Sequence, residues 1–390
     1  MTHSIDWKDL TPELFLKDYW QKKPLIIKSA FPDFVDPIEA NELAGLAMEE
    51  FIESRIVSKN NDSWDVKHGP FEDFSEFGDD NWTLLVQAVN HWFKDVDELT
   101  KPFKFIPNWR IDDVMMSFST PGGGVGPHLD QYDVFIVQGS GQRRWRVGAP
   151  DSTLVDLIPH EDLKQVSPFE AVIDEITDPG DLLYIPPNHP HDGIAIENSL
   201  NYSIGFQAPS TQELLSGLAD YNLDNNLFAQ RFDDSKRQVE ANPEQLTAKD
   251  LSLLTDVMQQ GLANPQLIED FLGKYLTTVH HTLNLLVPVE PMSVELISEI
   301  LTAGEILEPL LGLKCILTAA DQSQSSITSN NSKLFVNGES FIIDQTTIEL
   351  AKLLASKQPL TIVELKSSLT CLINSQLLTS VINKGLWTFE

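Results

Sequence analysis

One histidine and one aspartate, two positions apart, are the residues of this sequence best suited to bind a metal. His128 and Asp130 stand in the segment GPHLDQYDVF, after a glycine-rich turn and before an apolar run. Alternate residues of a strand point to the same face, so this spacing places an imidazole beside a carboxylate. A lone His-x-Asp is also a common surface pair, and the assignment therefore depends on a third ligand elsewhere.

The third ligand is expected from another strand, about sixty residues further along the chain. The segment PGDLLYIPPNHPHDG carries His189 and His191 after an apolar run. Two histidines and one carboxylate occupy one face of a metal ion and leave the other face open. Fe(II) oxygenases need these open positions for a bidentate 2-oxo acid and for O₂. The residues alone leave both histidines as candidates, and the same ligands bind manganese, cobalt or nickel.

Short strands must position these ligands. Between residues 109 and 208, apolar runs are separated at short intervals by glycine and proline, with no helical stretch between them. So many strands in succession predict an antiparallel barrel or jelly roll. The predicted strands lie within residues 110–119, 132–138, 143–148, 169–177, 182–187 and 199–208.

Helical spacing of apolar residues is found on both sides of this strand-rich stretch. One predicted helix, at 81–93, places Leu85, Val89 and Trp92 on one face. A segment with two prolines, at 287–292, is predicted to be a linker. The other predicted helices lie at 36–50, 210–230 and 244–286.

The C-terminal part of the chain has a third pattern. KLFVNGESFIID predicts a hairpin with Asn337 and Gly338 at its turn, followed by the helices TIELAKLLA and LTSVINKG and a closing strand LWTFE. A hairpin combined with short helices is typical of a winged helix, and the serine-rich segment 321–332 is predicted to be a loop. The chain therefore divides into a strand-rich domain at 1–208, a helical region at 209–304 and a winged-helix-like domain at 305–390.

Composition limits the classes of partner. The chain has 27 basic and 58 acidic residues, a formal net charge of −31. A surface this acidic repels nucleic acid and anionic lipid and attracts basic partners. The two cysteines form no disulfide framework or zinc motif. We find no signal peptide and no apolar run of the roughly 18 residues that a membrane span needs. We therefore expect a cytoplasmic protein without membrane contact.

The remaining histidines are expected to take no part in the metal site. His280 and His281 fall on the helix predicted at 244–286, where a solvated or interface pair is the simplest interpretation. His68 and His91 have no carboxylate at the spacing of a metal ligand.

The metal-binding motifs resemble the Jumonji C family of 2-oxoglutarate oxygenases, and more closely its bacterial ribosomal oxygenase branch. The likeness lies in GGGVGPHLDQYDVFIVQGSGQRRWRV and GDLLYIPPNHPHDG, with support from WQKKPLIIK, HGPFEDF, LLVQAVNHW and WRIDDVMMSFS. It implies an α+β chain with a double-stranded β-helix (cupin or jelly-roll) catalytic domain, a helical dimerisation region and a C-terminal winged-helix-like domain. The similar bacterial enzymes hydroxylate an arginine at Cβ in protein sixteen of the large ribosomal subunit.

This resemblance implies roles for the metal-site residues. His128, Asp130 and His191 match the family's metal ligands, and His189 becomes a candidate for supporting His191. The cofactor is then Fe(II), with 2-oxoglutarate and O₂ as cosubstrates.

An arginine is expected to bind the distal carboxylate of 2-oxoglutarate. Arg143 stands at the family's basic position, on the strand after the His-x-Asp motif. A guanidinium can bind a carboxylate with two parallel hydrogen bonds. Strand alternation points Arg144 and Arg146 the other way, where a solvated basic face is the simpler interpretation.

The strand predicted at 110–119 has two faces, and the more polar face is formed by Asp113, Met115, Ser117 and Ser119. An inward Asp113 is suited to hold a substrate guanidinium, and Ser117 to hydrogen-bond the cosubstrate or the substrate backbone. The alternatives are a capped strand end for Asp113 and ordinary core packing for Met115. The resemblance supports the functional roles.

Residues outside this strand complete the predicted substrate site. Tyr132 and Met115 are expected to sandwich the aliphatic stem of the substrate arginine, with the tyrosine ring favouring its positive charge. In NYSIGF, Asn201 and Ser203 share a face and are expected to add polar contacts. The resemblance supports Tyr132 more than Asn201.

Three functions are weighed against one another. The first is an Fe(II)- and 2-oxoglutarate-dependent hydroxylase of an arginine in a basic ribosomal protein, with a homodimeric chain. The second is a cupin-like sensor with a winged-helix interaction domain; residues 309–390 contain six lysines, no arginine and six acidic residues, so direct DNA binding is not expected. The third is a Jumonji C demethylase of another basic protein, which the metal site alone does not exclude.

Overall fold

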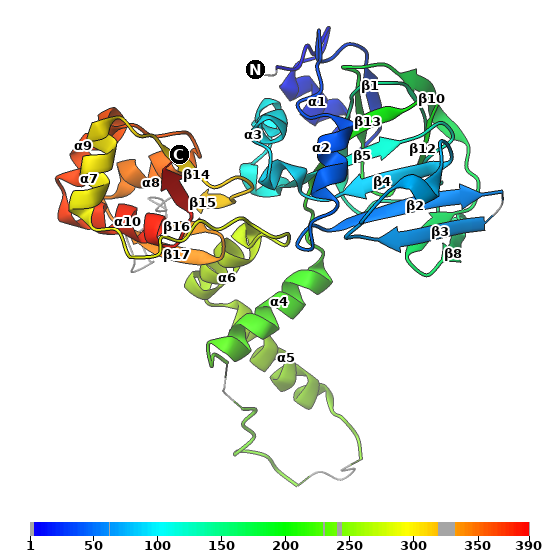
Figure 1. Cartoon of the computed structure of the whole chain (residues 1–390). Helices are drawn as coiled ribbons and strands as arrows, with labels where there is room; N and C mark the ends of the chain where they lie inside the picture. Colours follow the sequence, from blue (N-terminus) through cyan, green and yellow to red (C-terminus); the bar gives the residue numbers. More distant parts are fainter. Residues whose placement is uncertain (1–3, 62, 229–230, 240–243, 319–331, 390) are drawn as a thin grey trace.

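The computed structural model describes residues 4–61, 63–228, 231–239, 244–318 and 332–389. A strand-rich N-terminal domain lies beside a smaller C-terminal domain, and helices α4 (Thr211–Asp224) and α5 (Ala248–Leu262) project away from both (Figure 1). The serine-rich loop predicted at 321–332 lies outside the described residues, apart from Ser332.

The N-terminal domain is built on an eight-stranded sheet. Its strands pair antiparallel, and β13 and β5 lie at its centre, with β6 on the other side of β13. The strands in spatial order are β1 (Leu25–Ile27), β11 (Leu182–Ile185), β6 (Asp133–Gln138), β13 (Ser199–Phe206), β5 (Ile111–Ser119), β4 (Trp82–Val86), β2 (Ser54–Asn60) and β3 (Ser63–His68).

A second, three-stranded sheet covers one face of the first. Side chains of both sheets pack in one apolar cluster, with Val134 and Ile136 of β6 against Trp145 and Val147 of β7. The predicted antiparallel jelly-roll arrangement of residues 109–208 is therefore confirmed. The small sheet has the order β10 (Ala171–Thr177), β7 (Arg143–Gly148) and β12 (His191–Ala195). A separate hairpin of β8 (Asp156–His160) and β9 (Leu163–Val166) contacts β3 (Figure 1).

The prediction of a helix at 81–93 is wrong. This segment forms strand β4 and a short 3-10 turn, η2 (Val89–His91). All five residues of β4 are buried between β2 and β5. Leu84 packs into the main core while Leu85 packs into a cluster on the opposite face. Consecutive apolar residues that serve two faces of a buried strand imitate helical spacing.

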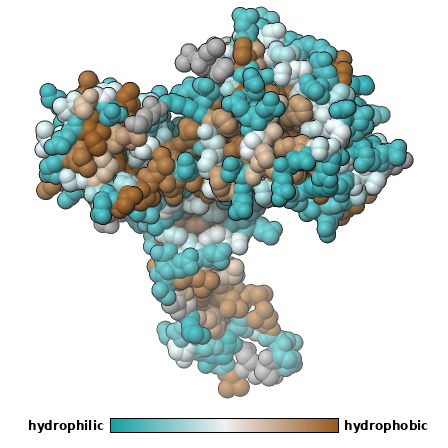
Figure 2. Space-filling model, in the orientation of Figure 1, coloured by the Kyte–Doolittle hydropathy of each residue, from teal (hydrophilic) through white to brown (hydrophobic). Residues whose placement is uncertain are grey.

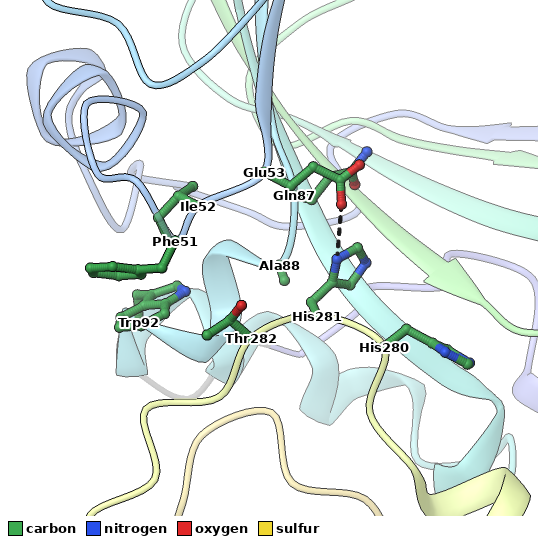
Figure 3. Close-up of a pocket in the computed structure, with 9 residues that line it drawn as sticks. All are labelled: Phe51, Ile52, Glu53, Gln87, Ala88, Trp92, His280, His281 and Thr282. Atoms are coloured by element: carbon green, nitrogen blue, oxygen red, sulfur yellow. Dashed lines mark ion pairs between the residues drawn. The ribbon is translucent and has the colours of Figure 1, made fainter.

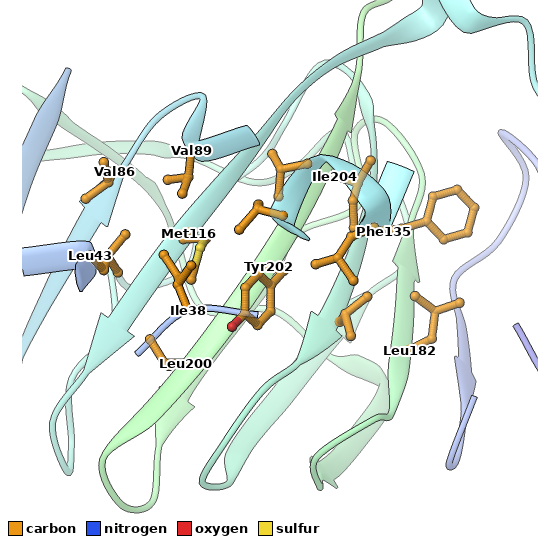
Figure 4. Close-up of a cluster of buried hydrophobic side chains, with 14 of the residues drawn as sticks. Ile38, Leu43, Val86, Val89, Met116, Phe135, Leu182, Leu200, Tyr202 and Ile204 are labelled. Atoms are coloured by element: carbon orange, nitrogen blue, oxygen red, sulfur yellow. The ribbon is translucent and has the colours of Figure 1, made fainter. Parts of the chain in front are cut away.

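The other face of the large sheet carries the main core. Met116, Phe135 and Tyr202 lie side by side on it, fully buried (Figure 4). Three short helices and three further 3-10 turns border this domain: α1 (Pro12–Asp18), α2 (Ala40–Leu46), α3 (Lys94–Asp97), η1 (Ser75–Phe77), η3 (Glu98–Phe103) and η4 (Asn108–Arg110).

Three helices follow β13, and each begins at a residue with a hydroxyl or amide side chain. Ser210 and Thr247 form capping boxes at α4 and α5, and Asn264 caps α6 (Pro265–Thr277). Because α6 ends at Thr277, the prediction that His280 and His281 lie on a helix is wrong. Within the described ranges, no helix is long and apolar enough to cross a membrane.

The C-terminal domain confirms the predicted hairpin, helices and closing strand. Asn337 and Gly338 take positive φ angles of 44° and 77° at the hairpin turn, as a two-residue Asn-Gly turn requires. The elements are α7 (Val294–Ala303), β14 (Leu307–Pro309), β15 (Cys315–Leu317), β16 (Ser332–Val336), β17 (Glu339–Ile343), α8 (Ile348–Ala355), α9 (Ile362–Leu369), α10 (Leu372–Asn383) and β18 (Trp387–Phe389).

Helix α7 packs with the C-terminal domain, although it precedes the boundary expected at residue 304. Ile297 and Leu301 are fully buried in the core that also contains Trp387. A boundary drawn on packing therefore falls before Val294.

The N-terminal and C-terminal domains are held together by ion pairs and by one close backbone approach. Lys314, only 4% exposed, lies 2.6 Å from Asp112 of β5, and Lys94 lies 2.7 Å from Glu308. Beside them, the buried His91 ring lies directly against Gly312, where an added Cβ would collide with the imidazole.

We expect Gly312→Ala to destabilise the protein more than Gly304→Ala. Both glycines have positive φ, 74° and 104°, so each substitution costs about 1 kcal/mol in backbone conformation. The Gly304 position is open, whereas overpacking against His91 adds about 1–3 kcal/mol. Thermal unfolding followed by circular dichroism should give the lower melting temperature for Gly312→Ala, and equal temperatures would contradict the close packing of these domains.

Candidate metal and cosubstrate site

Three side chains from two segments converge inside the N-terminal domain. His128, Asp130 and His191 each offer one donor atom, and these atoms lie within 4.8 Å of one another. Nε2 of His191 is 3.5 Å from Oδ2 of Asp130, and the two imidazole centroids are 4.1 Å apart. Metal–ligand bonds of about 2.1 Å place neighbouring donors roughly 3–4 Å apart, so the arrangement fits one divalent ion.

Backbone pairing rather than strand alternation brings these ligands together. The expectation that His128 and Asp130 lie in a strand is wrong, since β6 begins only at Asp133. Instead, His128 and His191 exchange two backbone hydrogen bonds of 3.0 Å in an isolated bridge. The amide of Asn188 also donates to the carbonyl of Asp130 at 2.8 Å. The two ligand segments are therefore tied to each other directly.

Carbonyl oxygens orient both imidazoles of the site. Nδ1 of His128 donates to the Gly126 carbonyl and Nδ1 of His191 to the His189 carbonyl, both at 2.9 Å. This leaves each Nε2 for a metal. The His189 side chain instead donates to the Pro187 carbonyl and stands outside the group of three, so the geometry favours His191 as the third ligand.

The electrostatics of the triad suit a cation. Burial lowers the pKa of His128 to about 4, so its ring is neutral and its lone pair is available at neutral pH. Burial opposes ionisation of Asp130, but the hydrogen bond and charge of His191 outweigh it and lower the pKa of Asp130 to about 2. The carboxylate is therefore charged, and it in turn raises the pKa of His191 despite burial.

A buried guanidinium lies in the same barrel, as strand alternation predicted. Arg143 is 4% exposed, and its Nη2 donates to Ser119 at 2.5 Å and to Ser199 at 3.4 Å. Its Nη1 lies 3.5 Å from Ser117. Burial lowers the pKa of Arg143 to about 9, which still leaves it cationic at neutral pH. Arg144, by contrast, pairs with Asp174 on the exposed face.

Three buried polar atoms in this part of the barrel lack a partner among the described residues: Nε of the Arg143 guanidinium, Nε1 of Trp145 and Oδ1 of Asn201. Such atoms are available to hydrogen-bond a bound molecule. A dicarboxylic acid such as 2-oxoglutarate fits, because its distal carboxylate can accept from the guanidinium while its other end reaches the metal ligands.

The predicted substrate residues come from two strands and one loop. Asp113 is 7% exposed; burial raises its pKa to about 6, against the opposing effects of His281 and the Ala88 amide. Met115 lies opposite Ser203 in the β5–β13 register and packs in an apolar cluster. Burial of its hydroxyl group, and then the charges of Asp130 and Asp113, raise the pKa of Tyr132, although its side chain is partly exposed.

Sequence reasoning missed two groups of residues. Ser119 and Ser199 support Arg143, and alternation from Ser117 and Asn201 was the signal that pointed to them. His281 gave no such signal, because it reaches Asp113 from a loop far away in the chain. Its Nε2 lies 3.7 Å from Oδ2 of Asp113.

Comparisons with known proteins cover the whole chain. A JmjC domain model matches residues 98–214, and a ROXA-like winged helix model matches residues 256–388. The ribosomal protein uL16 3-hydroxylase of Escherichia coli K12 is 42% identical over 387 residues, 99% of this chain and 98% of that protein. The X-ray structure of E. coli YcfD superposes with a TM-score of 0.92, at 42% identity over 100% of both chains. The structure of YcfD, an E. coli ribosomal oxygenase, in complex with cobalt and 2-oxoglutarate gives a TM-score of 0.88 and 40% identity, over 100% of this chain and 99% of that chain.

We expect His191→Ala to abolish metal binding and His189→Ala to preserve it. Removing a ligand should weaken Co(II) binding at least about 100-fold, more than loss of a supporting residue does. His189→Ala keeps the backbone carbonyl that orients His191, so its affinity should stay within about tenfold of wild type. Calorimetric titration with Co(II) measures both, and the reverse ranking would make His189 the third ligand.

Proposed function

The chain belongs to the JmjC-domain ribosomal oxygenases, and we propose that it hydroxylates an arginine of the large-subunit ribosomal protein uL16 at Cβ, as an Fe(II)- and 2-oxoglutarate-dependent dioxygenase. The double-stranded β-helix and winged-helix fold expected from the sequence is confirmed by the same comparisons. One observation carries the proposal: the group of three metal-ligating side chains shares a barrel with a buried guanidinium that hydrogen-bonds to serine hydroxyls and has no acidic partner among the described residues.

The triad is suited to hold Fe(II) through the two Nε2 atoms and the carboxylate of Asp130. Iron bound there supplies the chemistry that couples oxidative decarboxylation of 2-oxoglutarate to insertion of one oxygen atom of O₂ into a C–H bond. The chain's own contribution is to bind, orient and exclude water. The hydrogen bonds that fix the tautomers of His128 and His191 orient these two metal ligands.

Arg143 is assigned to the distal carboxylate of 2-oxoglutarate. The hydroxyls of Ser117, Ser119 and Ser199 hold the guanidinium in place without neutralising it. A charge-assisted pair in this buried barrel is stronger than the same pair in water. Trp145 closes one side, with its ring 5.8 Å from the guanidinium carbon.

Asp113 is assigned to the guanidinium of the substrate arginine. Met115 and Tyr132 then contact its aliphatic stem, and Ser203, opposite Met115, adds a hydroxyl. The Asp113 carboxylate is held by the Ala88 amide at 2.8 Å, which fixes its orientation before the substrate arrives. A chain of net charge −31 also attracts a basic ribosomal protein over long range.

The helical region is assigned to a homodimer contact. Helices α4 and α5 carry exposed apolar side chains, and Figure 2 shows them on the part that projects from the body. Their burial against a second copy removes this apolar surface from water. We further expect the enzyme to act in the cytoplasm, with its ribosomal substrate, and not to bind DNA. The exposed apolar residues of these helices are Leu215, Leu223, Leu251, Leu254, Met258 and Leu262.

The function is tested by mass spectrometry of uL16 incubated with the protein, Fe(II) and 2-oxoglutarate. We expect one added oxygen on an arginine with wild type and none with His128→Ala. Succinate formation without modification of uL16 would point to another basic substrate, as for a demethylase of another basic protein. Neither product, with metal bound, would favour a sensor.

The pH dependence of substrate binding should follow Asp113. Because its pKa is raised to about 6, the carboxylate protonates and loses its attraction for a guanidinium as pH falls from about 7 to about 5. The KM for uL16 should therefore rise over this range in wild type. Asp113→Asn should raise KM about tenfold or more at neutral pH and flatten the dependence. A slope retained in Asp113→Asn would assign the titration elsewhere.

A further inference from the structure

A pocket lies beside the substrate site, at the meeting point of three segments. Residues 51–53, which come directly before β2, form one side. Residues 87–92, after β4, form the floor, and residues 280–282, after α6, close it (Figure 3). The pocket encloses about 360 Å³, including the part that opens to solvent. The proposed reaction assigns no role to this pocket.

One wall of the pocket is aromatic. The rings of Phe51 and Trp92 lie 4.9 Å apart at 37°, and they stand together on one side of Figure 3. Phe51 is 48% exposed, so part of its ring is open to a ligand. Aromatic faces attract ammonium and guanidinium groups and pack against their aliphatic stems.

The facing wall is polar and negatively charged. Glu53 and Gln87 stand there, and the Glu53 side chain is 70% exposed. Nδ1 of His281 lies 3.4 Å from the Glu53 carboxylate (Figure 3). An aromatic wall opposite a carboxylate is the combination that recognises a cationic side chain.

His281 joins this pocket to the substrate site. One ring nitrogen faces Glu53 and the other lies 3.7 Å from Asp113, which we assign to the substrate guanidinium. The two carboxylates are thus separated by one imidazole. Side chains two residues apart in an extended peptide lie on one face, about 6.5–7 Å from each other. One extended segment of substrate can therefore reach both carboxylates.

Two nearby basic groups, Lys314 and His91, do not neutralise Glu53, and the imidazole of His281 is shared between Glu53 and Asp113. Lys314 is engaged by Asp112 at 2.6 Å. Burial lowers the pKa of His91 to about 4, so this ring is neutral at physiological pH. An anionic ligand would meet Glu53, and an apolar ligand would strip water from it, so a cation is the favoured occupant.

We propose that this pocket is a second cation subsite, which binds a lysine or arginine side chain of the substrate protein within a few residues of the hydroxylated arginine. The stem of that side chain lies on Phe51 and Trp92, and its charge meets Glu53. His281 is a positioning residue that holds Glu53 on one side and Asp113 on the other. This inference rests on the proposed function.

The test uses the full-length protein, Fe(II), 2-oxoglutarate and a synthetic uL16 peptide that spans the hydroxylated arginine. Glu53→Gln should raise the KM for the peptide about five- to tenfold while kcat stays within about twofold. Glu50→Gln is the matched control, since Glu50 is exposed, near Glu53, and outside the pocket lining. It should leave KM unchanged. Phe51→Leu, which removes the aromatic face but keeps apolar bulk, should raise KM about threefold.

A second series replaces each lysine or arginine near the target arginine of the peptide by alanine, one at a time. One replacement should raise the wild-type KM and make Glu53→Gln silent, as expected when both changes remove one contact. The proposal is overturned if Glu53→Gln and Glu50→Gln have the same KM, or if the Glu53→Gln effect persists with every alanine peptide. Failure of the proposed function looks different, because wild type would then leave the unaltered peptide unmodified.

Discussion

Two backbone hydrogen bonds between His128 and His191 are the contact on which the metal site depends. They join a loop ahead of β6 to the first residue of β12, and no side chain takes part in them. Each imidazole then donates to the carbonyl two residues before it, Gly126 or His189. Distance and orientation of two ligands are thus set by main-chain pairing, and the Asn188 amide, which donates to the Asp130 carbonyl, ties the third ligand to the same segment.

The buried charge of Arg143 imposes a second constraint, because it determines which ligands the barrel favours. Taking a guanidinium out of water is costly unless a counter-charge accompanies it. The serine hydroxyls around it supply hydrogen-bond acceptors but no negative charge. A ligand that carries a carboxylate to this depth offsets the cost of burial, and a ligand without one does not. The barrel therefore favours a 2-oxo acid with a second carboxylate over a shorter monocarboxylate.

Local patterns were enough to predict what depends on neighbours in the chain. Alternation along β7 places Arg143 inside and Arg144 outside, and Asn337-Gly338 marks the hairpin. The same patterns failed where distant segments decide the outcome. Strand β4 looks helical because each of its two faces packs into an apolar cluster. His281 meets Asp113 although the two residues are far apart in the chain, and no periodicity records such a contact.

Two adjacent carboxylates on β5 connect domain packing with substrate binding. Strand geometry sends their side chains to opposite faces. Asp112 therefore pairs with Lys314 of the C-terminal domain, while Asp113 faces His281 and the substrate site. The loop that carries His281 follows α6, and α6 is joined to the C-terminal hairpin by the ion pair of Lys333 with Asp270. Docking of the C-terminal domain thus helps to place His281 against Asp113, the residue that we assign to the substrate guanidinium.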